Sequence, residues 1–150
     1  MKPEIRISHQ PTIRRGTLQD AELLAELGAR TFSETFAVDN TPENMAAYLA
    51  TSFTPAKLAV DLVDPHCIFQ IAEIDRVAVG YSMLRSGAAP KQVTGERPIE
   101  LVRLYVSRDS LGTGVGATLM QACIDEAKSG GHQTLWLGVW EHNSRAQAFY

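Results

Sequence analysis

The sequence has little of what several classes of protein require. Only two of its 150 residues are cysteine, and Cys67 and Cys123 form no C-x-x-C pair, so a disulfide framework is not indicated. The four histidines lack the spacing of metal ligands. No apolar run approaches the roughly 18 residues of a membrane-spanning helix. With a net charge of −3, the chain also lacks the excess of basic residues that general nucleic-acid binding needs. We therefore expect a cytoplasmic protein without a metal, a membrane span or a nucleic-acid partner.

The rest of the composition is that of an ordinary globular protein. Hydrophobic residues make up 45% of the chain and charged residues 21%, which is enough apolar surface for one packed core. No internal repeat or linker-like stretch divides the sequence. We expect one domain over residues 1–150.

Acidic residues are concentrated between Asp39 and Asp75, where six of them accompany a single base, Lys57. An acidic face would favour a small cationic partner, because charge of one sign concentrates the other. A solvated helix surface is the alternative interpretation.

The spacing of apolar residues predicts both helices and strands. In chain order they are a strand at 13–15, helices after the N-caps Thr17, Thr41 and Thr54, strands at 68–74, 77–84 and 99–106, a helix over 114–129 and a strand at 134–139. The Asp75-Arg76 break is short enough for a hairpin. The last strand, helix and strand form a βαβ unit with parallel strands. The predicted fold is therefore α/β, with a mixed sheet.

A glycine-rich turn between the 99–106 strand and the following helix carries the clearest chemical signal. Gly112, Gly114 and Gly116 remove side chains where a ligand must approach the main chain. The free N–H groups and positive dipole end of the helix meet at the same place. This arrangement is typical of a phosphate or pyrophosphate site.

Two other kinds of phosphate site, the P-loop and the dinucleotide-binding turn, are also rich in glycine. A P-loop requires G-K-[ST] at the helix start, which Gly116-Ala117-Thr118 excludes. A dinucleotide turn of the form G-x-G-x-x-A is compatible with Gly112 to Ala117, but its strand normally ends closer to the first glycine and opens a multi-strand parallel sheet. Binding of a dinucleotide by an oxidoreductase therefore stays open as an alternative.

Four segments together resemble the GNAT superfamily of acetyl-CoA-dependent N-acetyltransferases. They are Glu100-Leu-Val-Arg-Leu-Tyr-Val106, Gly112-Thr-Gly-Val-Gly116, Leu135-Trp-Leu-Gly-Val139 and Asn143-x-x-Ala146-x-x-Phe149-Tyr150. The resemblance implies the GNAT fold, a mostly antiparallel sheet with one βαβ unit and two splayed parallel strands. Leu111 departs from the family pattern, which has Gln or Arg there. The family's final strands are also missing after Tyr150, so we expect the domain to be cut short at this end.

The resemblance implies roles for individual residues. It places acetyl-CoA, with no metal, on a set of residues that bind mainly through the main chain: Leu104, Val106, Leu111, Gly112, Gly114, Val115, Gly116, Ala117 and Asn143. Val106 would supply the N–H that stabilises the oxyanion. Asn143 would serve equally well as the cap of the final helix.

Two further residues are implied as catalytic. Glu100 stands where some GNAT enzymes carry the general base that deprotonates the amine, and Tyr150 where many carry the acid that protonates the thiolate. The alternatives are a strand glutamate paired with Arg97 or Arg103, and an aromatic residue packed on the last helix.

A narrower similarity, to bacterial spermine/spermidine N-acetyltransferases, lies in three segments. These are Thr31 to Phe36, Asn40 to Asn44 and Leu135 to Glu141. The similarity implies acetyl transfer to a primary amine of a polyamine. A protein lysine or N-terminal acceptor, and a regulator that binds acyl-CoA without catalysis, are the alternatives. The resemblance also implies that the chain could pair as a homodimer.

Overall fold

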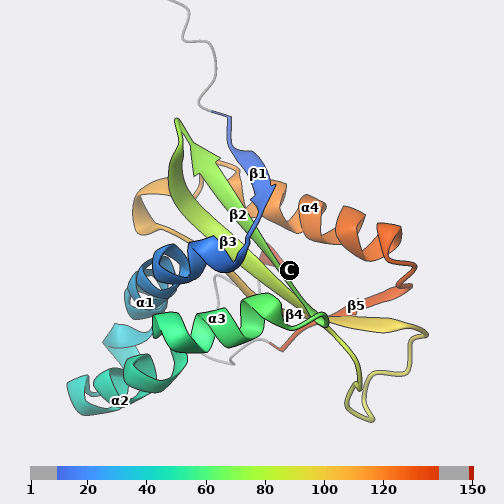
Figure 1. Ribbon diagram of the computed structural model, residues 1–150, viewed down its shortest axis with the longest axis horizontal. Coiled ribbons are helices and arrows are strands. Elements are labelled where there is room, and N and C mark those ends of the chain that lie inside the picture. Colours follow the sequence, from blue (N-terminus) through green and yellow to red (C-terminus); the bar gives the residue numbers. More distant parts are fainter. Residues whose placement is uncertain (1–9, 139–148) are drawn as a thin grey trace, which may run out of the picture.

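The computed structural model describes residues 10–138 and 149–150. It contains one five-stranded sheet in the order β1-β2-β3-β4-β5, in which only the β4–β5 pair is parallel (Figure 1). The elements are β1 (Thr12–Arg15), η1 (Leu18–Asp20), α1 (Ala21–Phe36), η2 (Ala37–Asp39), α2 (Pro42–Ser52), α3 (Pro55–Val63), β2 (Cys67–Ile74), β3 (Val77–Ser86), β4 (Pro98–Val106), η3 (Arg108–Ser110), α4 (Val115–Ser129) and β5 (Thr134–Trp136). The predicted α/β class, mixed sheet and βαβ unit are confirmed.

Helices cover both faces of the sheet (Figure 1). On one face, Leu24 and Leu27 of α1 and Leu58 of α3 pack with Phe69 and Tyr81 of the sheet, and all five are at least 98% buried. On the other face, α4 packs its apolar stripe against β3 and β4. That stripe consists of Val115, Leu119, Cys123 and Ala127. Cys123 is therefore a core residue.

Local sequence signals account for the starts of α2 and α3. Thr41 accepts the N–H of Asn44 at 3.1 Å, and Thr54 accepts that of Lys57 at 3.2 Å. A proline fills the first position of each helix, where its missing N–H costs nothing. The β2–β3 hairpin turns at Asp75 and Arg76, whose φ angles of 52° and 68° suit a two-residue loop.

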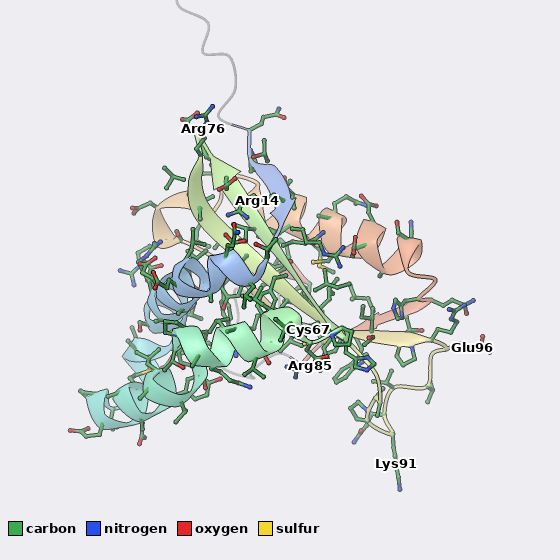
Figure 2. All side chains as sticks on the ribbon, viewed as in Figure 1. Arg14, Cys67, Arg76, Arg85, Lys91 and Glu96 are labelled. Carbon is green, nitrogen blue, oxygen red and sulfur yellow. The ribbon has the colours of Figure 1, made fainter. Side chains whose placement is uncertain are left out.

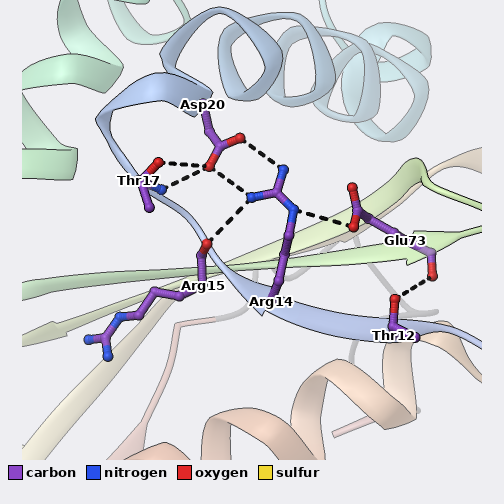
Figure 3. A network of polar contacts seen from close by, with 6 residues as sticks. All are labelled: Thr12, Arg14, Arg15, Thr17, Asp20 and Glu73. Carbon is purple, nitrogen blue, oxygen red and sulfur yellow. Dashed lines mark hydrogen bonds and ion pairs between the residues drawn. The ribbon is translucent and has the colours of Figure 1, made fainter.

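A polar network joins β1 to the start of α1 (Figure 3). Arg14 donates to both carboxylate oxygens of Asp20 at 2.8 and 2.9 Å, and its Nε lies 3.3 Å from Glu73 on β2. Asp20 also accepts the Thr17 N–H at 2.8 Å, which is one half of a capping box at the predicted N-cap Thr17. The Arg14 guanidinium lowers the pKa of Asp20, and burial opposes this shift.

The last strand is shorter than predicted. β5 pairs with β4 at only three positions, from Pro98 opposite Thr134 to Glu100 opposite Trp136, and Leu137 and Gly138 are no longer strand. The β3–β4 register skips Val102, which marks a bulge two residues after Glu100, the last residue of β4 that pairs with β5. A bulge bends its strand and increases its twist, so β4 turns away from β5 at this point. Val139 lies outside the described residues.

Candidate active site

Strand β4 continues beyond its parallel neighbour and exposes one edge. Among the described residues, Leu101 to Val106 have no partner on β5. The Ser107 N–H donates to Val79 of β3 at 2.8 Å. Since successive residues of a strand direct their N–H groups to opposite edges, the N–H groups of Leu104 and Val106 point to the open side. The strand thus offers main-chain donors where the two parallel strands part.

The glycine turn has the geometry that its sequence predicted. Gly112 and Gly114 have φ angles of +79° and +93°, a region in which other residues are strained. A methyl group added to either would meet no described atom within 4 Å, so the space beside them is open. Helix α4 begins at Val115 without a side-chain cap, which leaves the N–H groups of its first turn available.

The open β4 edge and the glycine turn line the same cleft, which has a volume of about 490 Å³. Other walls come from α1 and from the last two residues of the chain. The lining residues are Glu34, Thr35, Leu104, Tyr105, Val106, Arg108, Ser110, Leu111, Gly112, Gly114, Gly116, Ala117, Phe149 and Tyr150. An elongated ligand with an anionic portion would find main-chain donors along this cleft.

Most residues expected to bind coenzyme A therefore lie together. Leu111 lines the cleft and is 42% exposed. The side chain of Val115 is fully buried in the core, so only its main chain could reach a ligand. A methyl group on Gly116 would lie 3.4 Å from the Phe149 ring, which shows how closely α4 approaches the end of the chain. Asn143 lies outside the described residues.

Tyr150 lines the cleft, as a proton donor to a thiolate would need to. Partial burial, and to a smaller extent the Cys123 thiol, raise the pKa of Tyr150 above its ordinary value. Burial also raises the pKa of Tyr105, another lining residue, to about 12. Both phenols therefore keep their protons at neutral pH.

Glu100 lies apart from the cleft. It stands opposite Trp136 and Arg85 in the sheet register and precedes Leu104 by four residues, about 13 Å along an extended strand. Figure 2 shows Arg85 beside Cys67, at the end of the β2–β3 hairpin opposite to the turn at Arg76. No ion pair joins Glu100 to Arg97 or Arg103 in the described part of the chain. Its role as a general base stays a prediction.

The sequence did not predict two charged residues of the cleft wall. Glu34 and Arg108 are the only acid and the only base among the described lining residues. Their contact spans 74 positions of the sequence, and no local pattern announces a pairing of that range. The Thr31 to Phe36 segment is similar to a segment of spermine/spermidine N-acetyltransferases, but that similarity did not predict that Glu34 and Thr35 line the cleft.

The acidic excess between Asp39 and Asp75 does not form one face at the cleft. Asp61 is 5% exposed and lies 3.5 Å from Lys57 and 3.9 Å from Arg85. Glu73 of β2 pairs with Arg14 of the neighbouring strand β1. Asp61 and Glu73 therefore make local ion pairs within the fold, which is neither an acidic face at the cleft nor a solvated helix surface.

Aromatic residues of α1 and α2 pack against one another beside the cleft. Phe32 stacks on Tyr48 with ring centroids 4.5 Å apart, and it lies 4.6 Å from Phe36. Phe36 approaches the ring of Tyr105 edge-on at 6.4 Å. Since Tyr105 lines the cleft, this aromatic cluster extends from its wall under α1 and α2.

The described residues contain no group of three or more His, Cys, Asp or Glu side chains able to hold a metal ion. In the same part of the chain, no helix combines the length and apolar character that crossing a membrane requires.

Known proteins share both the sequence pattern and the fold. The family model for the acetyltransferase (GNAT) family matches residues 24–150. An uncharacterized N-acetyltransferase of Mycobacterium tuberculosis is 35% identical over 133 residues, covering 89% of this chain and 81% of the relative. An uncharacterized N-acetyltransferase from the pepI 3' region of Lactobacillus delbrueckii subsp. lactis is 31% identical over 124 residues, covering 83% and 72%.

Solved structures agree on the fold. The PaiA N-acetyltransferase of Thermoplasma acidophilum, in complex with coenzyme A, superposes with a TM-score of 0.83 at 23% identity. The match covers 94% of this chain and 86% of that one. An aminoglycoside acetyltransferase from an uncultured soil sample, in complex with sisomicin, gives 0.71 at 16% identity over 93% and 84% of the two chains.

Proposed function

The chain belongs to the acetyltransferase (GNAT) family and is an acetyl-CoA-dependent N-acetyltransferase, and we propose that its acceptor is a primary amine of a small cationic molecule, with a polyamine such as spermidine or spermine as the first candidate. The observation that carries this proposal is the cleft itself, whose only described acidic side chain is Glu34. Although Arg108 lines the same wall, the Glu34 carboxylate can pair directly with an ammonium group of a cationic acceptor. The similarity of Thr31 to Phe36 to spermine/spermidine acetyltransferases supports the same acceptor.

Coenzyme A fits the residues present, because the open space beside Gly112 and Gly114 is what a pyrophosphate needs to approach the main chain. In the proposed mechanism, free main-chain N–H groups between Gly112 and Ala117 bind the pyrophosphate. The main chain of Leu104 and Val106 binds the pantetheine arm as an added strand would. Acetyl-CoA would supply the thioester whose carbonyl carbon the neutral amine attacks.

We assign the chemical steps to three residues. The Val106 N–H stabilises negative charge that develops on the thioester oxygen, a contribution worth about 3–4 kcal/mol at comparable sites. Tyr150 donates its proton to the departing thiolate. Glu100 accepts a proton from the acceptor's ammonium, and its distance from the cleft requires water to carry that proton. Each role stays a prediction, as do a homodimer and a cytoplasmic location.

Labelled acetyl-CoA and a panel of acceptors test the proposal. We expect acetylation of spermidine and spermine, and faster turnover of 1,4-diaminobutane than of n-butylamine, which has the same chain length and one charge fewer. Acetylation of lysine peptides without any polyamine product would instead make the chain a protein acetyltransferase.

A regulator that binds acyl-CoA without catalysis would behave differently. It would bind acetyl-CoA in calorimetry, form no product with any amine and keep its affinity in the Glu100→Gln and Tyr150→Phe variants. Our proposal requires product from the unaltered chain.

A further inference from the structure

Helix α1 contacts the loop that follows β4 through three hydrogen bonds between side chains and main chain or hydroxyl groups. Arg30 Nη1 donates to Ser107 Oγ at 2.9 Å. One turn later, Glu34 Oε1 accepts the main-chain N–H of Arg108 at 3.1 Å. Arg108 Nη2 in turn donates to the main-chain oxygen of Glu34 at 3.3 Å. Two consecutive loop residues are therefore held by two residues of one helix.

The positive charge of Arg108 suits its position at the end of α1. Glu34 lies in the last turn of α1, whose carbonyl groups lack helical partners. A guanidinium that donates there interacts favourably with the negative end of the helix dipole. Arg108 thus approaches the helix end with its side chain, while its N–H meets the carboxylate. Ser107, the other residue held, is 6% exposed and also donates its N–H to β3.

The held residues lead directly into the glycine turn. η3 starts at Arg108, and its turns are closed by the N–H of Ser110 on Ser107 and that of Leu111 on Arg108. The Thr113 N–H then bonds to Ser110 at 3.3 Å. Beyond these short-range bonds, Gly112 and Gly114 border open space. On the side of β4, the orientation of the turn therefore depends on how Ser107 and Arg108 are fixed, and on the other side α4 anchors the turn through the buried Val115.

We propose that Arg30 and Glu34 are positioning residues for coenzyme A, which hold the Ser107–Arg108 segment so that the glycine turn is ready to receive the pyrophosphate. The inference rests on the proposed binding of coenzyme A at this turn. Its physical basis is the fraction of molecules in which the turn has the binding-competent conformation. When that fraction is below one, the apparent dissociation constant equals the intrinsic one divided by the fraction. A turn released by α1 would sample other conformations and bind more weakly.

Calorimetric titration of coenzyme A into two Glu34 variants tests this role without requiring turnover. Glu34→Ala removes the acceptor for the Arg108 N–H, and we expect the Kd for coenzyme A to rise about tenfold. Glu34→Gln removes the same charge but keeps a side-chain oxygen, and we expect its Kd to stay within about twofold of the unaltered protein. Steady-state kinetics should show a higher KM for acetyl-CoA in Glu34→Ala than in Glu34→Gln, with the same kcat in both at saturating substrates.

Two additional variants supply a control and an independent test. Glu22→Ala alters an exposed residue in the first turn of the same helix and should leave the Kd unchanged. Arg30→Met removes the bond to Ser107 and should also weaken binding, which supplies an independent measurement if Glu34→Ala folds poorly. Wild-type affinity in both Glu34→Ala and Arg30→Met would overturn the inference. Equal weakening in Glu34→Ala and Glu34→Gln would also overturn it, because charge would then matter rather than the hydrogen bond. An unaltered protein that fails to bind coenzyme A would contradict the proposed function itself.

Discussion

At the scale of single residues, the glycines with positive φ in the turn before α4 make the sharpest prediction. Gly114→Ala should raise the Kd for coenzyme A at least about tenfold. The added methyl group enters the space that the pyrophosphate needs, and a non-glycine residue at a φ of +93° costs about 1–2 kcal/mol. Isothermal titration calorimetry measures the change.

Gly87→Ala provides the matched control for backbone strain. Gly87 has a φ of +131° and also borders open space, but it lies in the loop between β3 and β4. The substitution should lower stability and leave coenzyme A affinity unchanged. Equal affinity of the Gly114→Ala and Gly87→Ala variants would refute the pyrophosphate site.

Tyr150 makes a second prediction at this scale. Tyr150→Phe should lower kcat by about 100-fold, the lower end of the usual contribution of a general acid. The KM for acetyl-CoA should change little, because the ring remains in place. Because the pKa of Tyr150 is raised, the kcat of the unaltered enzyme should fall through tyrosine ionisation only at a higher pH than an ordinary tyrosine would give. A kcat of Tyr150→Phe within twofold of the unaltered enzyme would assign the phenol to packing.

Residue roles were predictable where the chemistry is local. The positive φ values of Gly112 and Gly114 follow from a turn that only glycine fits well, and the sequence pattern located it. Glu34 and Arg108 were missed because their contact depends on how α1 packs beside the end of β4. The position of Glu100 along its strand was known, but not its separation from the cleft, which depends on where β5 stops pairing.

At the scale of elements, the network around Arg14 connects β1 to the first helix and makes a pH-dependent prediction. Asp20→Asn should lower the free energy of unfolding at pH 7 by about 2 kcal/mol, typical of hydrogen bonds to a charged group. Since the pKa of folded Asp20 lies below its unfolded value, its stabilisation is present above about pH 4 and is lost as pH falls through the folded pKa.

Urea unfolding at pH 7 and near pH 3 measures both parts of this prediction. The difference between the unaltered protein and Asp20→Asn should shrink at the lower pH. Asp39→Asn, which changes an exposed acid in η2, serves as the control. A difference that is constant over this pH range would show that the Asp20 charge does not act through Arg14.

The divergence of β4 from β5 makes a prediction about hydrogen exchange. The N–H groups of Leu104 and Val106 face the open edge, so they should exchange faster than those of neighbouring sheet residues in the free protein. Coenzyme A should slow both, because its pantetheine arm replaces the missing strand. Unchanged protection of Leu104 and Val106 in the complex would contradict this placement.

The elements show why prediction from sequence succeeded and where it stopped. Apolar spacing identified α4, and the threonine-proline pairs marked the starts of α2 and α3. The length of β5 was overestimated, because the apolar sequence continues past Trp136 with Leu137, while the sheet itself separates after Trp136. The bulge at Val102 that accompanies this separation arises from pairing between strands, which no single segment encodes.

At the scale of the whole molecule, ligand binding should stabilise the fold by mass action. Coenzyme A at 100 times its Kd adds about 2.7 kcal/mol of stability, which corresponds to a rise in Tm of about 5–10 °C for a chain of this size. Differential scanning fluorimetry detects such a shift. NAD at the same concentration should produce no shift in Tm. The dinucleotide alternative predicts the opposite result, a shift with NAD and none with coenzyme A.

The most direct test of the whole account is a crystal structure of the protein with acetyl-CoA. We predict that pyrophosphate oxygens lie within hydrogen-bond distance of main-chain N–H groups between Gly112 and Ala117. The thioester should lie beside Leu104 and Val106 on the open edge of β4. A pyrophosphate bound away from the N-terminus of α4 would contradict the account.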